Sequence, residues 1–237
     1  MRAVVTLALL VACGRMHFEP SGGAPTDAIG SPDADATAAP LFVQSAHGAS
    51  VSPVQVALQP TRAGSLLVAG VTNEATAGDD VSSMVDSAGD VFTSVNLRAI
   101  VSCGGSVEIW SVNSVHAGVT SVSVTMSSAI PVTAWVIEIA DVAPTAHAVS
   151  GTEASVQPTT TLVALPQVAT PADSLVFSIA QICNDQPIGV HFGTPFTGLA
   201  PSQYSEPAYY IATTAGSYGA ELDTLGGIWC GSTAAFH

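Results

Sequence analysis

The sequence predicts an all-β protein: a two-sheet β-sandwich, jelly-roll-like, that follows a disordered N-terminal tether. From Leu41 onward, short runs rich in Val, Ile, Thr and Ser alternate with clusters of Gly, Pro, Asn and Asp. No segment keeps apolar residues at helical spacing over three turns. Only 9% of the 237 residues are charged, against about 25% in a usual soluble domain, which excludes a salt-bridged helical bundle and a coiled coil.

The chain begins with a targeting segment. A short charged start precedes the apolar residues 3–10, and the run ends in Leu10-Val11-Ala12-Cys13. A charged start and a short apolar run are typical of a signal peptide. The closing tetrapeptide looks like a bacterial lipobox, in which small residues precede the cysteine that receives the lipid. We therefore expect residues 1–12 to be a lipoprotein signal peptide and Cys13 to be lipidated; an ordinary secretory signal is the alternative.

Residues 13–40 are expected to be a disordered tether that starts at the lipidated Cys13. The segment is rich in Pro, Gly, Ala and Asp and poor in large apolar residues. Such a chain buries too little surface to offset the entropy of ordering it. Gly14, after the lipidated cysteine, is not the Asp that favours inner-membrane retention in some bacteria. The expected location is therefore the bacterial cell envelope, at the outer membrane or cell surface, with the lipid as the membrane attachment.

Residues 41–237 are expected to form the sandwich. Residues 65–72 (SLLVAGVT) and 132–139 (VTAWVIEI) are apolar on both faces, which predicts central strands. Residues 120–126 (TSVSVTM) alternate, which predicts a strand with one solvated face. The other strands of the first series are predicted at 42–45, 55–58, 83–87, 91–101 and 106–112. A second series is predicted at 160–165, 175–182, 189–192, 196–199, 208–212, 218–222 and 228–236.

The two series resemble each other. The segment that begins SVSPVQVALQ at Ser50 is similar to the one that begins SVQPTTTLVAL at Ser155, and each series closes on a strand with a tryptophan, Trp135 or Trp229. One interpretation is a duplicated half-sandwich; the other is two sets of strands that share only their composition. Trp229 and Phe236 are expected in the core on either interpretation.

The motifs GSLLVAGV, MVDSAGDVFTSV, GGSVEIWSV, AWVIEIADVA and GIWCGSTAAFH, in this order, resemble a β-sandwich module that recurs in extracellular and surface proteins of soil bacteria. The resemblance implies the fold and an extracellular compartment. It implies no catalytic residues.

Charge excludes one class of partner. The chain has no lysine and a formal net charge of −14, so it repels phosphate backbones and is not expected to bind nucleic acid. The expected partners are the membrane, through Cys13, and a glycan or an envelope protein.

Acidic residues offer two kinds of candidate site. Glu108 and Glu138 each lie in a predicted strand near a tryptophan, and a pair of carboxylates in one cleft is what glycoside hydrolysis needs. Strand alternation argues against this pair, because Glu108 shares a face with Trp110 whereas Glu138 lies opposite Trp135. Asp79 and Asp80 stand with Glu74 in an acidic loop that is a candidate calcium site, although the spacing of a calcium-binding loop is missing. No metal or cofactor is predicted.

Tyr204, Tyr209 and Tyr210 are candidate ligand contacts, since aromatic rings stack on sugars. Tyr209 and Tyr210 point to opposite faces of a strand, so one of them is expected in the core. Cys103, Cys183 and Cys230 remain after Cys13 is assigned. Of the three possible pairings in an oxidising compartment we prefer a disulfide between Cys183 and Cys230, whose strands are expected to lie antiparallel.

The sequence thus predicts a non-catalytic surface or envelope lipoprotein that serves as a binding or structural module. The alternative is an extracellular polysaccharide hydrolase with its acid and base among Glu108, Glu138, Asp79 and Asp80.

Overall fold

The computed structural model describes residues 39–73, 79–95, 99–100, 105–142, 149–154, 162–183, 191–202, 204–223 and 228–237. Their regular elements are all β-strands, and Thr37–His237 forms one compact unit. The prediction of an all-β sandwich is confirmed. The signal peptide, Cys13 and the tether up to residue 38 lie outside the described residues.

The first repeat comprises strands β1 to β9. Their bounds are β1 (Leu41–Val51), β2 (Val54–Ala57), β3 (Leu66–Asn73), β4 (Val81–Asp86), β5 (Thr93–Ser94), β6 (Ala99–Ile100), β7 (Ser106–Val112), β8 (Ser121–Met126) and β9 (Pro131–Ala140). Inner sheet 1 has the order β1-β9-β3-β7-β5, with β6 also paired to β7, and outer sheet 1 has the order β2-β8-β4.

The second repeat comprises strands β10 to β19. Their bounds are β10 (Val149–Ala154), β11 (Leu162–Ala164), β12 (Val168–Thr170), β13 (Ser174–Cys183), β14 (His191–Phe192), β15 (Thr197–Gly198), β16 (Ser205–Ala212), β17 (Gly216–Tyr218), β18 (Glu221–Asp223) and β19 (Ile228–Phe236). Inner sheet 2 has the order β10-β19-β13-β16-β15. Outer sheet 2 consists of β11-β18-β14 and the pair β12-β17.

The two repeats have the same strand order, which supports the duplication. In each inner sheet the first strand of the repeat (β1 or β10) pairs with the last strand of the repeat (β9 or β19). That last strand also pairs with a central strand (β3 or β13), which follows a tight turn. That turn contains a residue with positive φ in both repeats, Gly64 at 80° and Asp173 at 56°. A buried serine follows in both, Ser65 and Ser174. Counting from these serines gives equivalent positions throughout the central strands.

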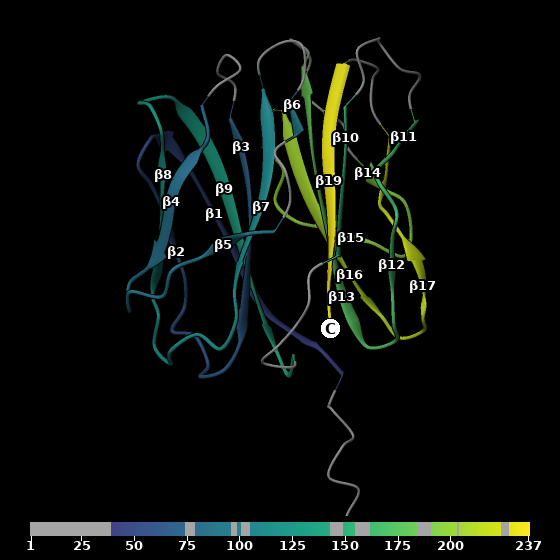
Figure 1. The fold of residues 1–237 in the computed structure, drawn as a ribbon, viewed down its shortest axis with the longest axis horizontal. Coiled ribbons are helices and arrows are strands. Elements are labelled where there is room, and N and C mark those ends of the chain that lie inside the picture. The colour runs from purple at the N-terminus through teal and green to yellow at the C-terminus, as the bar shows by residue number, and fades with distance from the viewer. Residues whose placement is uncertain are drawn as a thin grey trace, which may run out of the picture. The chain divides into compact units, whose positions relative to one another are not determined.

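Each repeat is a complete sandwich, so the structure has four layers of sheet where the sequence predicted two (Figure 1). One core lies between the sheets of the first repeat and contains Val71 and Met84. The central core joins the two inner sheets and contains Trp135, Phe177 and Phe236. Burying side chains of this size contributes about 1.5–3 kcal/mol each. Smaller clusters lie between inner and outer sheet 2.

Most predicted strands are present, and the differences have local causes. The predicted strand 91–101 is two short strands, β5 and β6. The predicted strand 218–222 is broken between β17 and β18 at Gly219, where an added Cβ would lie 2.6 Å from the carbonyl oxygen of Pro166. Strands β10 and β12 were not predicted; β10 has the mixed sequence VSGTEA and lies at a sheet edge.

Candidate functional site: an uncharged cleft between the repeats

Glu138 forms hydrogen bonds that link three parts of the fold. Its side chain is fully buried. The carboxylate accepts hydrogen bonds from Gln44 Nε2 at 2.6 Å, from the backbone N–H of Arg62 at 2.7 Å and from Ser65 Oγ at 2.9 Å. Glu138 therefore fastens β9 to β1 and to the turn before β3. A buried carboxylate with this many donors is a structural group.

Glu108 occupies a separate position. Its side chain is 6% exposed and accepts hydrogen bonds from the backbone N–H of Val81 at 3.1 Å and from Trp110 Nε1 at 3.0 Å. The strand-alternation argument is confirmed here, because Glu108 and Trp110 share a face.

The two glutamates do not converge. Across β3, Leu67 is opposite Glu138 and Val71 is opposite Glu108. Four residues of strand separate these positions by about 13 Å, whereas the carboxylates of a glycosidase lie within about 9.5 Å of each other. The proposed acid and base of a hydrolase are thus not brought together in this pair.

The acidic loop after β3 is partly described. Asp79 accepts a hydrogen bond from Ser128 Oγ, and the backbone N–H of Asp80 donates to Ser127 Oγ at 3.1 Å. Glu74 lies outside the described residues. Within the described part of the chain, no group of three or more His, Cys, Asp or Glu side chains is arranged to hold a metal ion.

Two of the three candidate tyrosines pack against other rings. Tyr209 stacks on Phe42, with ring centroids 4.6 Å apart and planes 8° apart. Tyr210 lies on the opposite face of β16, against Phe196 and Tyr218. Tyr204 precedes β16 and is half-buried. A ligand contact by any of these tyrosines stays a prediction.

The predicted disulfide also stays a prediction. Strands β13 and β19 are antiparallel neighbours, as expected, but Cys183 is opposite Ile228 and Cys230 is opposite Gln181. The two cysteines are thus diagonal neighbours, for which a Cα separation of about 7–8 Å is usual, and disulfides favour about 4.4–6.8 Å. Cys230 is buried in the central core; the side chain of Cys183 and all of Cys103 lie outside the described residues.

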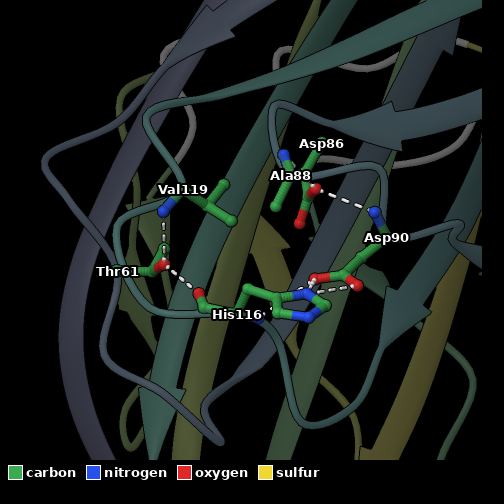
Figure 2. Close-up of polar contacts among 6 residues, drawn as sticks. All are labelled: Thr61, Asp86, Ala88, Asp90, His116 and Val119. Atoms are coloured by element: carbon green, nitrogen blue, oxygen red, sulfur yellow. Dashed lines mark hydrogen bonds and ion pairs between the residues drawn. The ribbon is translucent and has the colours of Figure 1, made fainter.

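His116 and Asp90 form a pair that the sequence analysis missed (Figure 2). His116 Nδ1 lies 2.8 Å from Asp90 Oδ1, and the backbone N–H of His116 donates to Asp90 Oδ2 at 3.0 Å. The hydrogen bond and charge of Asp90 raise the pKa of His116 above its ordinary value. The backbone and side-chain N–H groups of His116 lower the pKa of Asp90. The imidazole is 71% exposed.

The surroundings of this pair identify it as a link between two turns. Asp86 Oδ1 accepts the N–H groups of Ala88 at 2.9 Å and Asp90 at 3.0 Å, so Asp86 caps the tight turn that leads to Asp90. Thr61 Oγ1 donates to the carbonyl oxygen of His116 at 2.9 Å. Within the described residues, the hydrogen bonds of the His116 ring are made by Nδ1, and none reaches the outer nitrogen, Nε2.

A cleft of about 350 Å³ lies at the end of inner sheet 1, beside the loop that precedes β16. The residues that line it in the described part of the chain are Ala49 and Ser50 of β1, Thr72 and Asn73 of β3, Pro131, Val132 and Thr133 of β9, and Ser202 of the loop. None of them carries a charge, and most are polar. The cleft is therefore suited to hydrogen bonding without ion pairing.

Hydrogen bonds hold the walls of the cleft in place. Trp135 Nε1 donates to the carbonyl oxygen of Ala200 at 2.7 Å, which ties the loop to inner sheet 1. Ser205 Oγ donates to Thr72 Oγ1 at 3.1 Å. Asn73 Nδ2 donates to Ser106 Oγ at 2.7 Å. The first two contacts join the two repeats and the third joins β3 to β7, so together they fix the shape of the cleft.

Among the described residues that line the cleft, Thr133 has the hydroxyl group with the most unused hydrogen-bonding capacity. It is half-buried and makes no hydrogen bond through its hydroxyl to the described residues, whereas Thr72 accepts one from Ser205. A hydroxyl donates one hydrogen bond and accepts two. Thr133 can therefore bind a polar ligand group directly.

The described residues contain no helix of the length and apolarity that crossing a membrane would need. No protein-family model, curated protein or solved structure matches this chain.

Proposed function

We propose that this chain is a non-catalytic, lipid-anchored binding module of the bacterial cell envelope, whose cleft takes an uncharged, hydroxyl-rich ligand such as a segment of glycan. The lipid is on Cys13, residues 13–40 are the tether, and the sandwich presents the cleft.

The cleft carries this proposal. Among its described lining residues, the polar side chains carry hydroxyl groups and one amide, and none is charged. Sugar hydroxyls are at once donors and acceptors, and they match side-chain hydroxyls on both counts. The pyrrolidine ring of the exposed Pro131 adds apolar surface, which suits the C–H faces of a sugar. Anionic polymers fit less well, because the chain has a net charge of −14.

The buried carboxylates favour binding over hydrolysis. Glu138 and Glu108 each accept hydrogen bonds from backbone and side-chain donors of their own repeat. General acid–base catalysis needs such groups within hydrogen-bond reach of a substrate.

Titration with neutral hexasaccharides of glucose and of N-acetylglucosamine tests the proposal. We expect amide resonances of Ser50, Thr133 and Ser202 to shift in nuclear magnetic resonance spectra, and an oligogalacturonate of the same length to leave them unchanged. Thr133→Val should weaken binding at least tenfold. Thr125→Val is the matched control, because Thr125 is a half-buried threonine of β8 in outer sheet 1.

Binding that is unchanged in Thr133→Val would place the ligand elsewhere. Release of sugar from pooled polysaccharides, abolished by Glu108→Gln or Glu138→Gln in a folded variant, would identify an enzyme and overturn the proposal.

A further inference from the structure

Glu108 and Glu206 occupy the same position in the two repeats. Glu108 is opposite Val71 of β3, and Glu206 is opposite Ala180 of β13. Val71 and Ala180 are each the sixth residue after the equivalent serines, Ser65 and Ser174. The neighbouring backbone agrees: the N–H of Val95 donates to Ile109 in the first repeat and that of Leu199 donates to Pro207 in the second, both at 2.9 Å.

The two carboxyl groups have different surroundings. Glu108 accepts hydrogen bonds from Val81 and Trp110. Glu206 is equally buried, with 7% of its surface exposed, but its Oε2 has no hydrogen-bond partner. An ionised carboxylate in such a place lacks the donors that would replace water.

Short strands cover Glu206. An added Cβ on Gly198 of β15 would lie 2.6 Å from Glu206 Oε1 and 3.1 Å from the ring of Phe192 of β14. Both strands have only two residues, and each pairs along one edge in the described sheets. Short edge strands of this kind have few backbone hydrogen bonds, so their opening costs little free energy.

We propose that Glu206 is a proton-operated switch in the second repeat: its neutral form is compatible with the closed cover of β14 and β15, and its ionisation loosens that cover. In the closed state no hydrogen-bond donor stabilises a charge on Glu206 Oε2, so the carboxyl group holds a proton and stays neutral. When the cover opens, water can stabilise the ionised carboxylate. Glu108 is the built-in comparison, because donors satisfy its ionised form.

The pH range follows from the environment of Glu206. Burial raises its pKa from 4.5 to about 7. The folded state therefore holds the proton more tightly than the unfolded state, and stability is lost as the pH rises from about 4.5 to about 7. Titratable groups on the surrounding elements are Tyr204 beside β16, His191 of β14, and Glu221 and Asp223 of β18.

The first test is urea unfolding of the full chain and of Glu206→Gln at pH 5 and pH 8. We expect the ratio of the wild-type unfolding constant to that of Glu206→Gln to rise about tenfold or more between these pH values. Glu108→Gln is the matched control and should be destabilised at both pH values with the wild-type pH dependence retained. Equal pH dependence in wild type and Glu206→Gln would overturn the proposal.

The second test uses only the wild-type protein. Carbon-13 resonances of the labelled glutamate carboxyl groups should include one that titrates near pH 7, and amide exchange at Leu199 should accelerate between pH 5 and pH 8 more than at its equivalent, Val95. If every glutamate titrates near its ordinary pKa, or if Leu199 and Val95 accelerate equally, the switch is excluded.

Discussion

Gly70 of β3 packs against Ile179 of β13, the residue that holds the same position in the second repeat. A Cβ added to Gly70 would lie 2.7 Å from Ile179 Cδ1 and 3.0 Å from the ring of Phe177. Equivalent residues that face each other are the mark of an isologous interface. The two sandwiches thus pack in the manner of a symmetric dimer within one chain, and Gly70 sets how closely the inner sheets approach.

Gly70→Ala tests this packing. The new methyl group has no space in the central core, and overpacking costs about 1–3 kcal/mol. Urea unfolding should show that loss. Gly193→Ala is the control, because an added Cβ there makes an ordinary contact of 3.6 Å with Glu221. Equal stability of the two variants would mean that the inner sheets can move apart at no cost.

Glu138→Gln tests the buried carboxylate. Three donors face it, and an amide in its place presents an N–H₂ group to at least one of them. We expect a loss of about 2–4 kcal/mol in the free energy of unfolding. Glu221→Gln, at an exposed position, should change stability little. A fully stable Glu138→Gln would show that the three hydrogen bonds contribute nothing net.

We expect the His116–Asp90 pair to stabilise the fold only within a limited range of pH. His116 has a raised pKa, so its contribution to stability is complete below about 6.5 and is lost as the pH rises through the raised value. Asp90 has a lowered pKa, so its contribution is present above 3.8 and is lost as the pH falls through the lowered value. Proton resonances of the His116 ring should titrate above pH 6.5 in wild type and return toward 6.5 in Asp90→Asn. An unchanged titration in Asp90→Asn would contradict the assignment.

Lipidation of Cys13 is tested in cells. Expression in a bacterium fed a labelled fatty acid should give a labelled protein if the proposed lipobox Leu10-Val11-Ala12-Cys13 directs acylation of the thiol. Cys13→Ala should carry no label and should leave the membrane fraction or accumulate as the uncleaved precursor. Label that persists in Cys13→Ala would exclude this lipid site.

Local patterns were enough to predict much of the fold. The strands at β7 and β19 have the predicted bounds, because runs of β-branched residues between turn residues depend on neighbours in sequence. The hairpin from Asp86 to Asp90 follows from Asp86 capping its own turn and from Gly89 at a φ of 94°. The apolar run in β3 predicted a central strand, and β3 is buried at every position.

Pairings between distant residues needed the tertiary structure. Gln44 and Glu138 are 94 residues apart, and Asp90 and His116 are 26 apart. No sequence pattern marks such partners, because strand register and the packing of one repeat on the other place them. The same holds for the cleft, whose lining comes from both repeats. The sequence by itself determined strands and turns, which depend on residues close together in the chain. The four layers, the contrast between Glu108 and Glu206 and the position of the cleft were decided by contacts between sheets, where burial and hydrogen bonding act over long sequence separations.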